Sequence, residues 1–145
     1  MKNSDIGFYL RKLNNFIQKY SHSLYSRKET NECSLSNLWV IDYLMDNTDK
    51  DIYQKDIETE FSINRATASK MLSLMEEKKF ISRETSAVDG RLKKVVVLPE
   101  GEKMRKICLN IRKEMEQELT SPLTKEEAET LKKILRKMVT AFQNY

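Results

Sequence analysis

The sequence contains few residues that interrupt regular structure and few that bind metals. Three glycines and two prolines in 145 residues leave most of the chain free to form helices. Two cysteines are too few for a disulfide framework, so we expect Cys33 and Cys108 to be reduced. The single histidine, His22, argues against a histidine-rich metal site, and we expect no metal.

Signals for membrane insertion, export and catalysis are missing as well. No run of about 18 apolar residues occurs and no secretory signal opens the chain, so we expect no membrane partner. We find no glycine-rich phosphate loop and no nucleophile beside a base, which predicts no cofactor and no enzyme activity. A triad assembled only by folding would leave no such pattern, so an enzyme stays an alternative. The simplest prediction is a cytoplasmic protein.

Charge is abundant and slightly basic. Charged residues make up 33% of the chain and hydrophobic residues 39%, and the net charge is +4. A chain of this length and composition suits a single domain, with or without helical extensions. The positive charge permits a nucleic-acid partner, although basic proteins of other classes share it.

Apolar side chains recur at helical spacing along most of the chain. Ser34, Asn64 and Thr124 are good N-caps, and Pro99 fits the first position of a helix. Two strand-like segments flank the turn signal Asp89-Gly90. The expected elements are helices at 5–26, 34–45, 54–60, 64–78, 99–119 and 124–143 and strands at 80–85 and 92–98. We therefore predict a mainly α fold with a small β-wing.

This order of elements is typical of a winged helix-turn-helix, which places one helix in a DNA groove and a hairpin beside it. The helix that starts near Arg65 carries small, polar or basic side chains on one face, so its backbone can approach DNA closely. We expect Arg65 to read a guanine edge and Lys70 to meet a phosphate. The start of the helix at 54–60 should point its amides at the DNA backbone. An ordinary amphipathic helix with a solvated face would show the same pattern.

Basic residues also concentrate on the predicted hairpin, where Arg91 at the tip is placed to enter a minor groove. A basic edge that prevents strand-to-strand aggregation would look the same. We predict that DNA is contacted by residues of the helix-turn-helix and the hairpin, namely Gln54, Lys55, Asn64, Arg65, Ala66, Thr67, Ser69, Lys70, Arg83, Asp89, Arg91 and Lys93.

Several motifs resemble those of the MarR family of bacterial winged-helix regulators. Asp89-Gly90-Arg91 and the spacing to Gly101 match the wing signature of that family. The segment 64–69 is similar to the start of its recognition helix, and 75–83 is similar to its passage from that helix into the wing. The flanking helices also occur in the expected order, so the resemblance covers nearly the whole chain.

Several positions depart from the pattern of that family, among them Val97, which stands where the family has leucine. Ser62 in the turn and Lys79 after the recognition helix stand where the family usually has glycine. If the backbone takes positive φ there, each residue carries strain of about 1 kcal/mol. Leu98 replaces the usual threonine cap, so Pro99 has to start its helix with less help.

The resemblance implies one domain over 1–145, with 34–98 as the DNA-binding part and 1–33 and 99–145 as a helical dimerisation part. The terminal helices carry more apolar surface than one small winged domain can cover, which also favours a homodimer. Further implications are a double-stranded DNA partner, repression, and a small-molecule effector between the dimer helices and the winged part. The candidate pocket residues are Phe16, Tyr20, Trp39, Tyr43 and Met104. A place in the hydrophobic core is the commoner role for side chains of this kind.

Two alternatives concern function and regulation. A winged-helix module that contacts protein and no longer binds DNA would suit the pair Glu76-Glu77 and the modest net charge. Cys33 precedes a predicted helix, whose N-terminus would lower the pKa of its thiol, so it is a candidate redox switch. Its position does not match that of the sensing cysteine in thiol-responsive relatives of the family.

Overall fold

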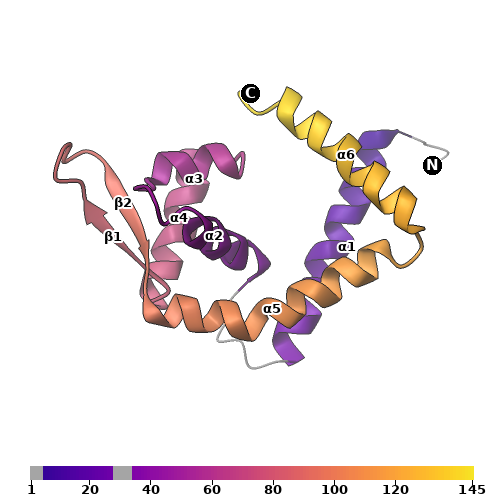
Figure 1. Cartoon of the computed structure of the whole chain (residues 1–145), viewed down its shortest axis with the longest axis horizontal. Coiled ribbons are helices and arrows are strands. Elements are labelled where there is room, and N and C mark those ends of the chain that lie inside the picture. Colours follow the sequence, from indigo (N-terminus) through magenta and orange to yellow (C-terminus); the bar gives the residue numbers. More distant parts are fainter. Residues whose placement is uncertain (1–4, 28–33) are drawn as a thin grey trace.

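The computed structural model describes residues 5–27 and 34–145 (Figure 1). The described elements are α1 (Ile6–Arg27), α2 (Leu35–Asp46), α3 (Gln54–Glu60), α4 (Arg65–Glu77), β1 (Ile81–Thr85), β2 (Lys93–Val97), α5 (Pro99–Thr120) and α6 (Lys125–Ala141). Each helix and strand expected from the sequence is present, and its ends lie within about two residues of the predicted ones. The prediction of a mainly α fold with a small β-wing is confirmed.

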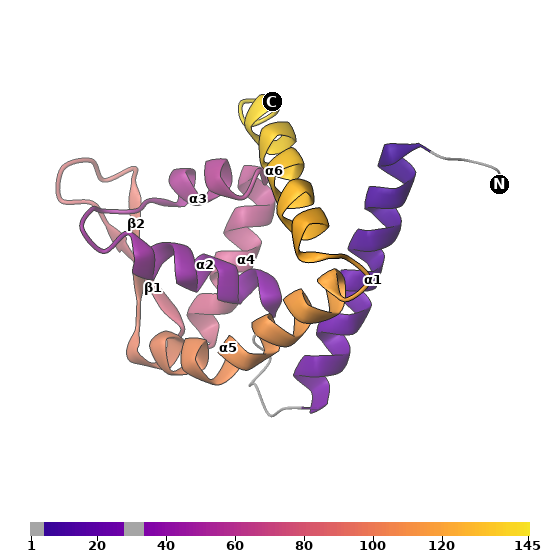
Figure 2. The ribbon, with the colours of Figure 1, turned by 45° about the vertical axis from the view of Figure 1, so that its right-hand side comes forward.

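Helices α2, α3 and α4 gather beside the two-stranded ribbon, and α5 runs from the base of that ribbon to the far end of the molecule, where α1 lies against it (Figure 1). After α5 the chain turns back through α6, which stands clear of α1 when the molecule is turned (Figure 2). The strands pair antiparallel with Ile81 opposite Val97 and Thr85 opposite Lys93. Together these elements form a winged helix-turn-helix with long flanking helices.

The hydrophobic core lies where α2, α4, α5 and the base of the ribbon meet. Its largest fully buried side chains are Phe80, Leu38, Ile41, Ile57, Leu72, Met75, Ile81, Ile111, Val40 and Cys108. Full burial of side chains of this size contributes roughly 1.5–3 kcal/mol each. Cys108 is thus a packed residue of the core, whereas His22 is exposed. Cys33 lies outside the described residues.

The predicted helix caps are formed by side chains. Asn64 Oδ1 accepts a hydrogen bond from the Thr67 amide at 2.8 Å, and Ser34 caps α2 in the same way. Thr124 and Glu127 form a reciprocal capping box at the start of α6. The Leu98 side chain cannot cap α5. That helix therefore begins at Pro99 without a side-chain hydrogen bond at its N-terminus, as the sequence predicts. Local sequence therefore sets where these helices start.

Both helices of the helix-turn-helix end in the same strained motif. Ser62 and Lys79 have φ of 52° and 62°, which lie in the left-handed region that glycine adopts most easily. These are the two positions where the family usually has glycine. After α3, the amides of Ser62 and Ile63 donate to the carbonyls of Thr59 and Glu58, and Lys79 and the next residue repeat this pattern after α4. These bonds satisfy carbonyls at the helix ends, which offsets a cost of about 1 kcal/mol at each residue.

Gly101 allows α5 to begin against the end of α4. A Cβ atom at this position would lie 2.3 Å from the Phe80 carbonyl oxygen and 3.0 Å from Val97 Cγ1. The same carbonyl accepts a hydrogen bond from the Leu98 amide at 2.9 Å, so it is not free to move away. Any larger residue at position 101 therefore has to push the start of α5 away from the Phe80 carbonyl.

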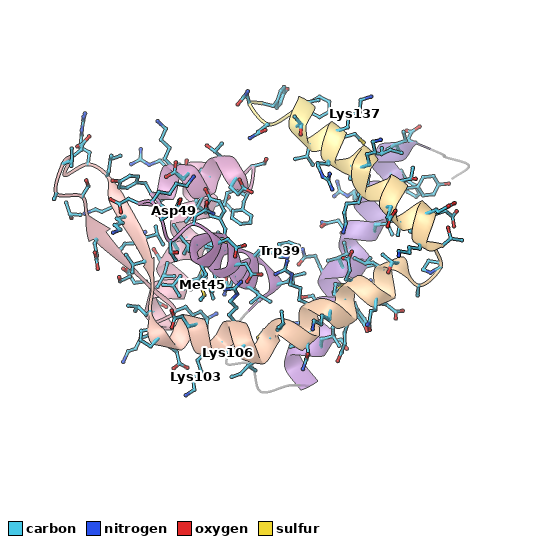
Figure 3. The ribbon with its side chains drawn as sticks, viewed as in Figure 1. Trp39, Met45, Asp49, Lys103, Lys106 and Lys137 are labelled. Atoms are coloured by element: carbon cyan, nitrogen blue, oxygen red, sulfur yellow. The ribbon has the colours of Figure 1, made fainter. Side chains whose placement is uncertain are left out.

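A charged cluster joins α2 to α5. Asp42 is 7% exposed on α2, and its carboxylate pairs with Arg105 at 2.5 Å and also with Arg112, both on α5. Arg105 in addition reaches Asp46 at 3.5 Å and the sulfur of Met45 at 3.4 Å. Figure 3 shows Met45 pointing from α2 toward α5. A buried carboxylate with two guanidinium partners fixes how the two helices lie against each other.

The terminal helices keep apolar side chains on the surface. None of the residues of α6 is buried, although it carries a pronounced apolar side. The exposed large hydrophobic residues are Ile6, Tyr9, Leu10, Leu13 and Phe16 on α1, Leu131, Ile134 and Val139 on α6, and Phe142 directly after α6. Exposed apolar side chains in this number on two helices are unusual for a monomer.

Replacing Gly101 by alanine should destabilise the protein by about 1–3 kcal/mol, because the new methyl group overlaps the Phe80 carbonyl. Gly7→Ala is the matched control, since no atom lies within 4 Å of its added Cβ. That change should raise stability by roughly 0.5–1 kcal/mol. Urea denaturation of the two variants measures both effects, and equal stabilities would contradict the close contact.

Replacing Lys79 by glycine should stabilise the fold by up to about 1 kcal/mol, because glycine adopts positive φ without a steric penalty. The neighbouring Lys78 has φ of −78°, so Lys78→Gly gains no such relief and should lower stability. Thermal denaturation of the two single variants gives the comparison. A loss of stability in both would mean that Lys79 carries no strain.

Candidate nucleic-acid interface

The start of α4 presents small and basic side chains to solvent. Arg65, Ala66, Thr67 and Lys70 are exposed, whereas Ala68 is fully buried and fixes the opposite face of the helix against the core. Because Asn64 caps this helix, its first turn has a defined backbone with short side chains around it. Ser69 is half-buried at the edge of this surface.

The start of α3 is less open to an anion than the sequence predicts. The Tyr53 amide donates to the Asp56 carboxylate at 2.8 Å, so this helix N-terminus already holds a negative charge. Gln54 lies 3.5 Å from a carboxylate oxygen of Glu58, and Lys55 is exposed. Contact of Gln54 and Lys55 with DNA stays a prediction.

The ribbon points back toward the start of α4. The Phe80 amide donates to Met75 near the end of α4, while Arg83, further along β1, bonds to Ser73, which lies nearer the start of the helix. β1 therefore runs antiparallel to α4, and the tip of the ribbon lies at the same end of the molecule as the start of α4. Figures 1 and 2 agree on this placement.

The tip of the ribbon is an ordered turn built around Asp89. Its carboxylate accepts from the Arg91 amide at 3.0 Å and from the Arg91 guanidinium at 3.2 Å. The Arg91 side chain is nevertheless 91% exposed. The hydrogen bonds from the Arg91 side chain and amide lower the pKa of Asp89, and the ion pair holds the guanidinium beside Asp89 at the exposed tip. Asp89 is therefore placed to orient Arg91.

The three remaining basic residues of the ribbon have partners within the chain. Lys93 Nζ donates to Thr85 Oγ1 across the ribbon at 2.9 Å. Lys94 pairs with Asp51 at 3.0 Å, and that hydrogen bond raises the pKa of the lysine. Arg83 bonds to Glu76 and Ser73 of α4, with its side chain 21% exposed. Contact of Lys93 or Arg83 with DNA stays a prediction, and the structure ties Arg83 to protein atoms.

The five candidate pocket residues do not share one environment. Met104 is buried in the core, and Tyr20 and Tyr43 pack against that core. The rings of Phe16 and Tyr20 stack at 5.7 Å. Burial raises the pKa of the Tyr43 hydroxyl, with smaller contributions from Glu60 and Asp56. The core role, which the sequence already favours for such residues, therefore describes Met104.

Trp39 lines a groove between the flanking helices and α2. The side chain is 42% exposed and lies on the side of α2 that faces α1 (Figure 3). The groove has a volume of about 560 Å³. Its apolar lining residues are Ile17, Leu35, Trp39, Leu109, Met115 and Leu119, and its charged ones are Arg112, Lys113, Glu116 and Lys132.

Sequence reasoning missed Ser73, Glu76 and Asp51 as partners of the ribbon. Ser73 and Glu76 are three residues apart, a spacing that places both on one face of α4, but their partner is visible only once the strand is placed. Within the described ranges, no group of three or more potential metal-ligating side chains converges. No helix among residues 5–27 and 34–145 has the length and apolar character needed to cross a membrane.

Comparison with known proteins gives matches to transcriptional regulators. A sequence model of the MarR family matches residues 34–92. The transcriptional regulator HosA of Escherichia coli is 33% identical over 75 residues, which make up 52% of this chain and 56% of HosA. The match thus spans little more than half the length of that relative.

Two solved structures extend the similarity over the whole chain. A DNA complex of MepR from S. aureus has a TM-score of 0.82 and 26% identity, and the match covers 96% of this chain and 99% of that one. The transcription regulator MarR from Oenococcus oeni PSU-1 has a TM-score of 0.68 and 31% identity, over 94% of this chain and 99% of that one. Because identity at this level runs through nearly the full length of both chains, on the same winged helix-turn-helix, the protein belongs to the MarR family of transcriptional regulators.

Proposed function

We propose that this protein is a sequence-specific DNA-binding repressor that acts as a homodimer and releases its operator when a small molecule binds. The observation that carries the proposal is the common placement of the exposed start of α4 and the arginine-tipped ribbon at one end of the molecule. A single DNA duplex can then contact both the start of α4 and the tip of the ribbon. The similar MepR structure is a complex with DNA, which supports the same proposal.

The proposal assigns each element a part of the DNA according to the side chains that the element exposes. In the proposal, α4 enters the major groove, where Arg65 donates to a guanine edge and Lys70 to a phosphate. Arg91, held forward by Asp89, enters the adjacent minor groove, where negative potential is strongest when the groove is narrow. Residues 34–98 would thus form the DNA-binding part.

The homodimer is proposed from the apolar side chains that α1 and α6 leave exposed. Two copies bury such stripes against each other when residues 1–33 and 99–145 form the dimerisation part. A two-fold dimer presents two recognition helices to half-sites about 34 Å apart, so the operator should be pseudo-palindromic. The relatives named above are bacterial proteins, and we place this one in the cytoplasm with its DNA.

The effector site is proposed at the groove lined by Trp39. It lies between the flanking helices and the winged part, and Arg112 belongs both to its lining and to the charged cluster around Asp42. A ligand there would alter how α5 lies on α2, and so the spacing of the two recognition helices. Duplexes selected from a random pool, followed by small molecules that release them, would identify both partners.

Replacing Arg65 or Arg91 by alanine should weaken binding to a selected duplex by about 5- to 150-fold, because each change removes a donor from a groove. Arg65→Ala should also relax the preference at one base position. Fluorescence anisotropy over a range of salt concentrations measures both the affinity and its salt dependence.

The matched control is Lys103→Ala, which removes one positive charge from an exposed side chain of α5 far from the ribbon tip (Figure 3). Its effect should be small. If Arg65→Ala and Arg91→Ala bind as tightly as the wild type, the DNA-contact mechanism is wrong. Binding without salt dependence, or none at all, would favour a protein-interaction module instead.

Replacing Leu13 by glutamate should weaken the homodimer, because the side chain is 50% exposed on the apolar stripe of α1. Asn14→Glu adds the same charge to the neighbouring exposed position and should leave the dimer intact. Light scattering should give twice the chain mass of 17.1 kDa for the wild type and the control. A wild-type monomer at micromolar concentration would refute the dimer.

A further inference from the structure

Arg83 lies on the inner side of the ribbon. Side chains two residues apart share one face of a strand, so Arg83 continues the row that begins with the fully buried Ile81. Its partner across the ribbon is Val95, which is 4% exposed. An arginine in this row faces the helices and not the solvent.

Three hydrogen bonds hold Arg83 against α4. Its amide donates to Glu76 Oε2 at 3.0 Å, and its guanidinium donates to Glu76 Oε1 at 3.2 Å and to Ser73 Oγ at 2.9 Å. Both carboxylate oxygens of Glu76 therefore accept hydrogen bonds from one residue of β1, Arg83. Charge-assisted pairs of this kind fix geometry as well as adding energy.

The ribbon is anchored on its other strand too. The Val95 amide donates to the Ile52 carbonyl at 2.8 Å, and Tyr53 pairs with Lys94 as an extra bridge. On β1, the residues that follow Arg83 are exposed. Arg83 therefore holds β1 to α4 at the point where the ribbon leaves the body of the protein.

A small rotation at this point becomes a large displacement at the tip. About five residues separate Arg83 from the turn, which at 3.3 Å per residue is about 17 Å. A 10° rotation at Arg83 would then shift the tip, and Arg91 with it, by about 3 Å. That is roughly the length of one hydrogen bond, enough to remove a side chain from its place in a groove.

We propose that Glu76, Ser73 and Arg83 form a clamp that sets the angle between the wing and the recognition helix. Arg83 is then a positioning residue that acts on DNA through the placement of Arg91. The inference rests on the proposed DNA-binding function. It assigns to Glu76 a favourable role in binding a polyanion, although a glutamate near DNA ordinarily opposes binding.

The test compares Glu76→Gln with Glu77→Gln, using a fluorescein-labelled duplex that the wild-type protein selects from a random-sequence pool. Both changes remove one negative charge from adjacent positions of α4, and Glu77 is exposed. Electrostatics alone predicts that both variants bind slightly tighter. The clamp predicts that Glu76→Gln binds about 3- to 10-fold more weakly, while Glu77→Gln binds as well as the wild type or better.

A double-mutant cycle with Arg91→Ala separates positioning from a general loss of structure. In the wild-type background Arg91→Ala should cost about tenfold in affinity. In the Glu76→Gln background it should cost less than about threefold, because the arginine is already out of place. Ser73→Ala, which leaves every charge unchanged, should show a smaller effect in the same direction.

Circular dichroism and thermal denaturation establish that each variant is folded at the temperature of the binding measurement. If Glu76→Gln unfolds, Ser73→Ala and its cycle with Arg91→Ala carry the test. Should Glu76→Gln bind as tightly as Glu77→Gln, or the Arg91→Ala cost be the same in both backgrounds, the clamp is overturned while DNA binding stands. If the wild type selects no duplex, the proposed function fails, and the clamp with it.

Discussion

The carbonyl group of Phe80 is the point where the recognition helix, the wing and the long linking helix meet. Its oxygen accepts a hydrogen bond from the Leu98 amide at 2.9 Å and lies against Gly101, while the Phe80 side chain is fully buried in the hydrophobic core. Because β1 begins at the next residue and α5 begins just after Leu98, the direction of both is set here. The ribbon and α5 leave this junction in fixed directions, so the winged part and the flanking helices keep a fixed orientation relative to each other.

The helix starts could be predicted from the sequence because their signals are local. Asn64 and Thr124 cap helices through side-chain bonds that span three residues, and neither bond depends on the rest of the fold. The strand-like segments on either side of Asp89-Gly90 predicted the wing, and the spacing from there to Gly101 added the resemblance to the family. The positive φ at Ser62 and Lys79 was likewise visible as a departure from glycine.

Pairings between distant elements could not be predicted in the same way. Arg83 carries a charge on a short hairpin, which suggests a surface residue, but the strand register turns it inward toward Glu76. Asp42 interrupts an apolar helix, and the two arginines that pair with it lie on α5, 63 and 70 residues away in sequence. Such contacts depend on how elements pack, and one sequence read alone does not contain that geometry. This is why Arg83 was assigned to DNA together with Arg91 and Lys93, whereas the structure pairs Arg83 with Glu76 and leaves the side chain of Arg91 91% exposed beside Asp89.

Helix α6 has 17 residues, and none of them is buried within its own subunit. Helices of this length are only marginally stable in water when nothing covers their apolar side. In the homodimer that we propose, contacts with the second copy would supply the order of this segment, and its share of the folding free energy would grow with the logarithm of protein concentration. On that proposal, dilution of the protein would act as a denaturant for this end of the molecule.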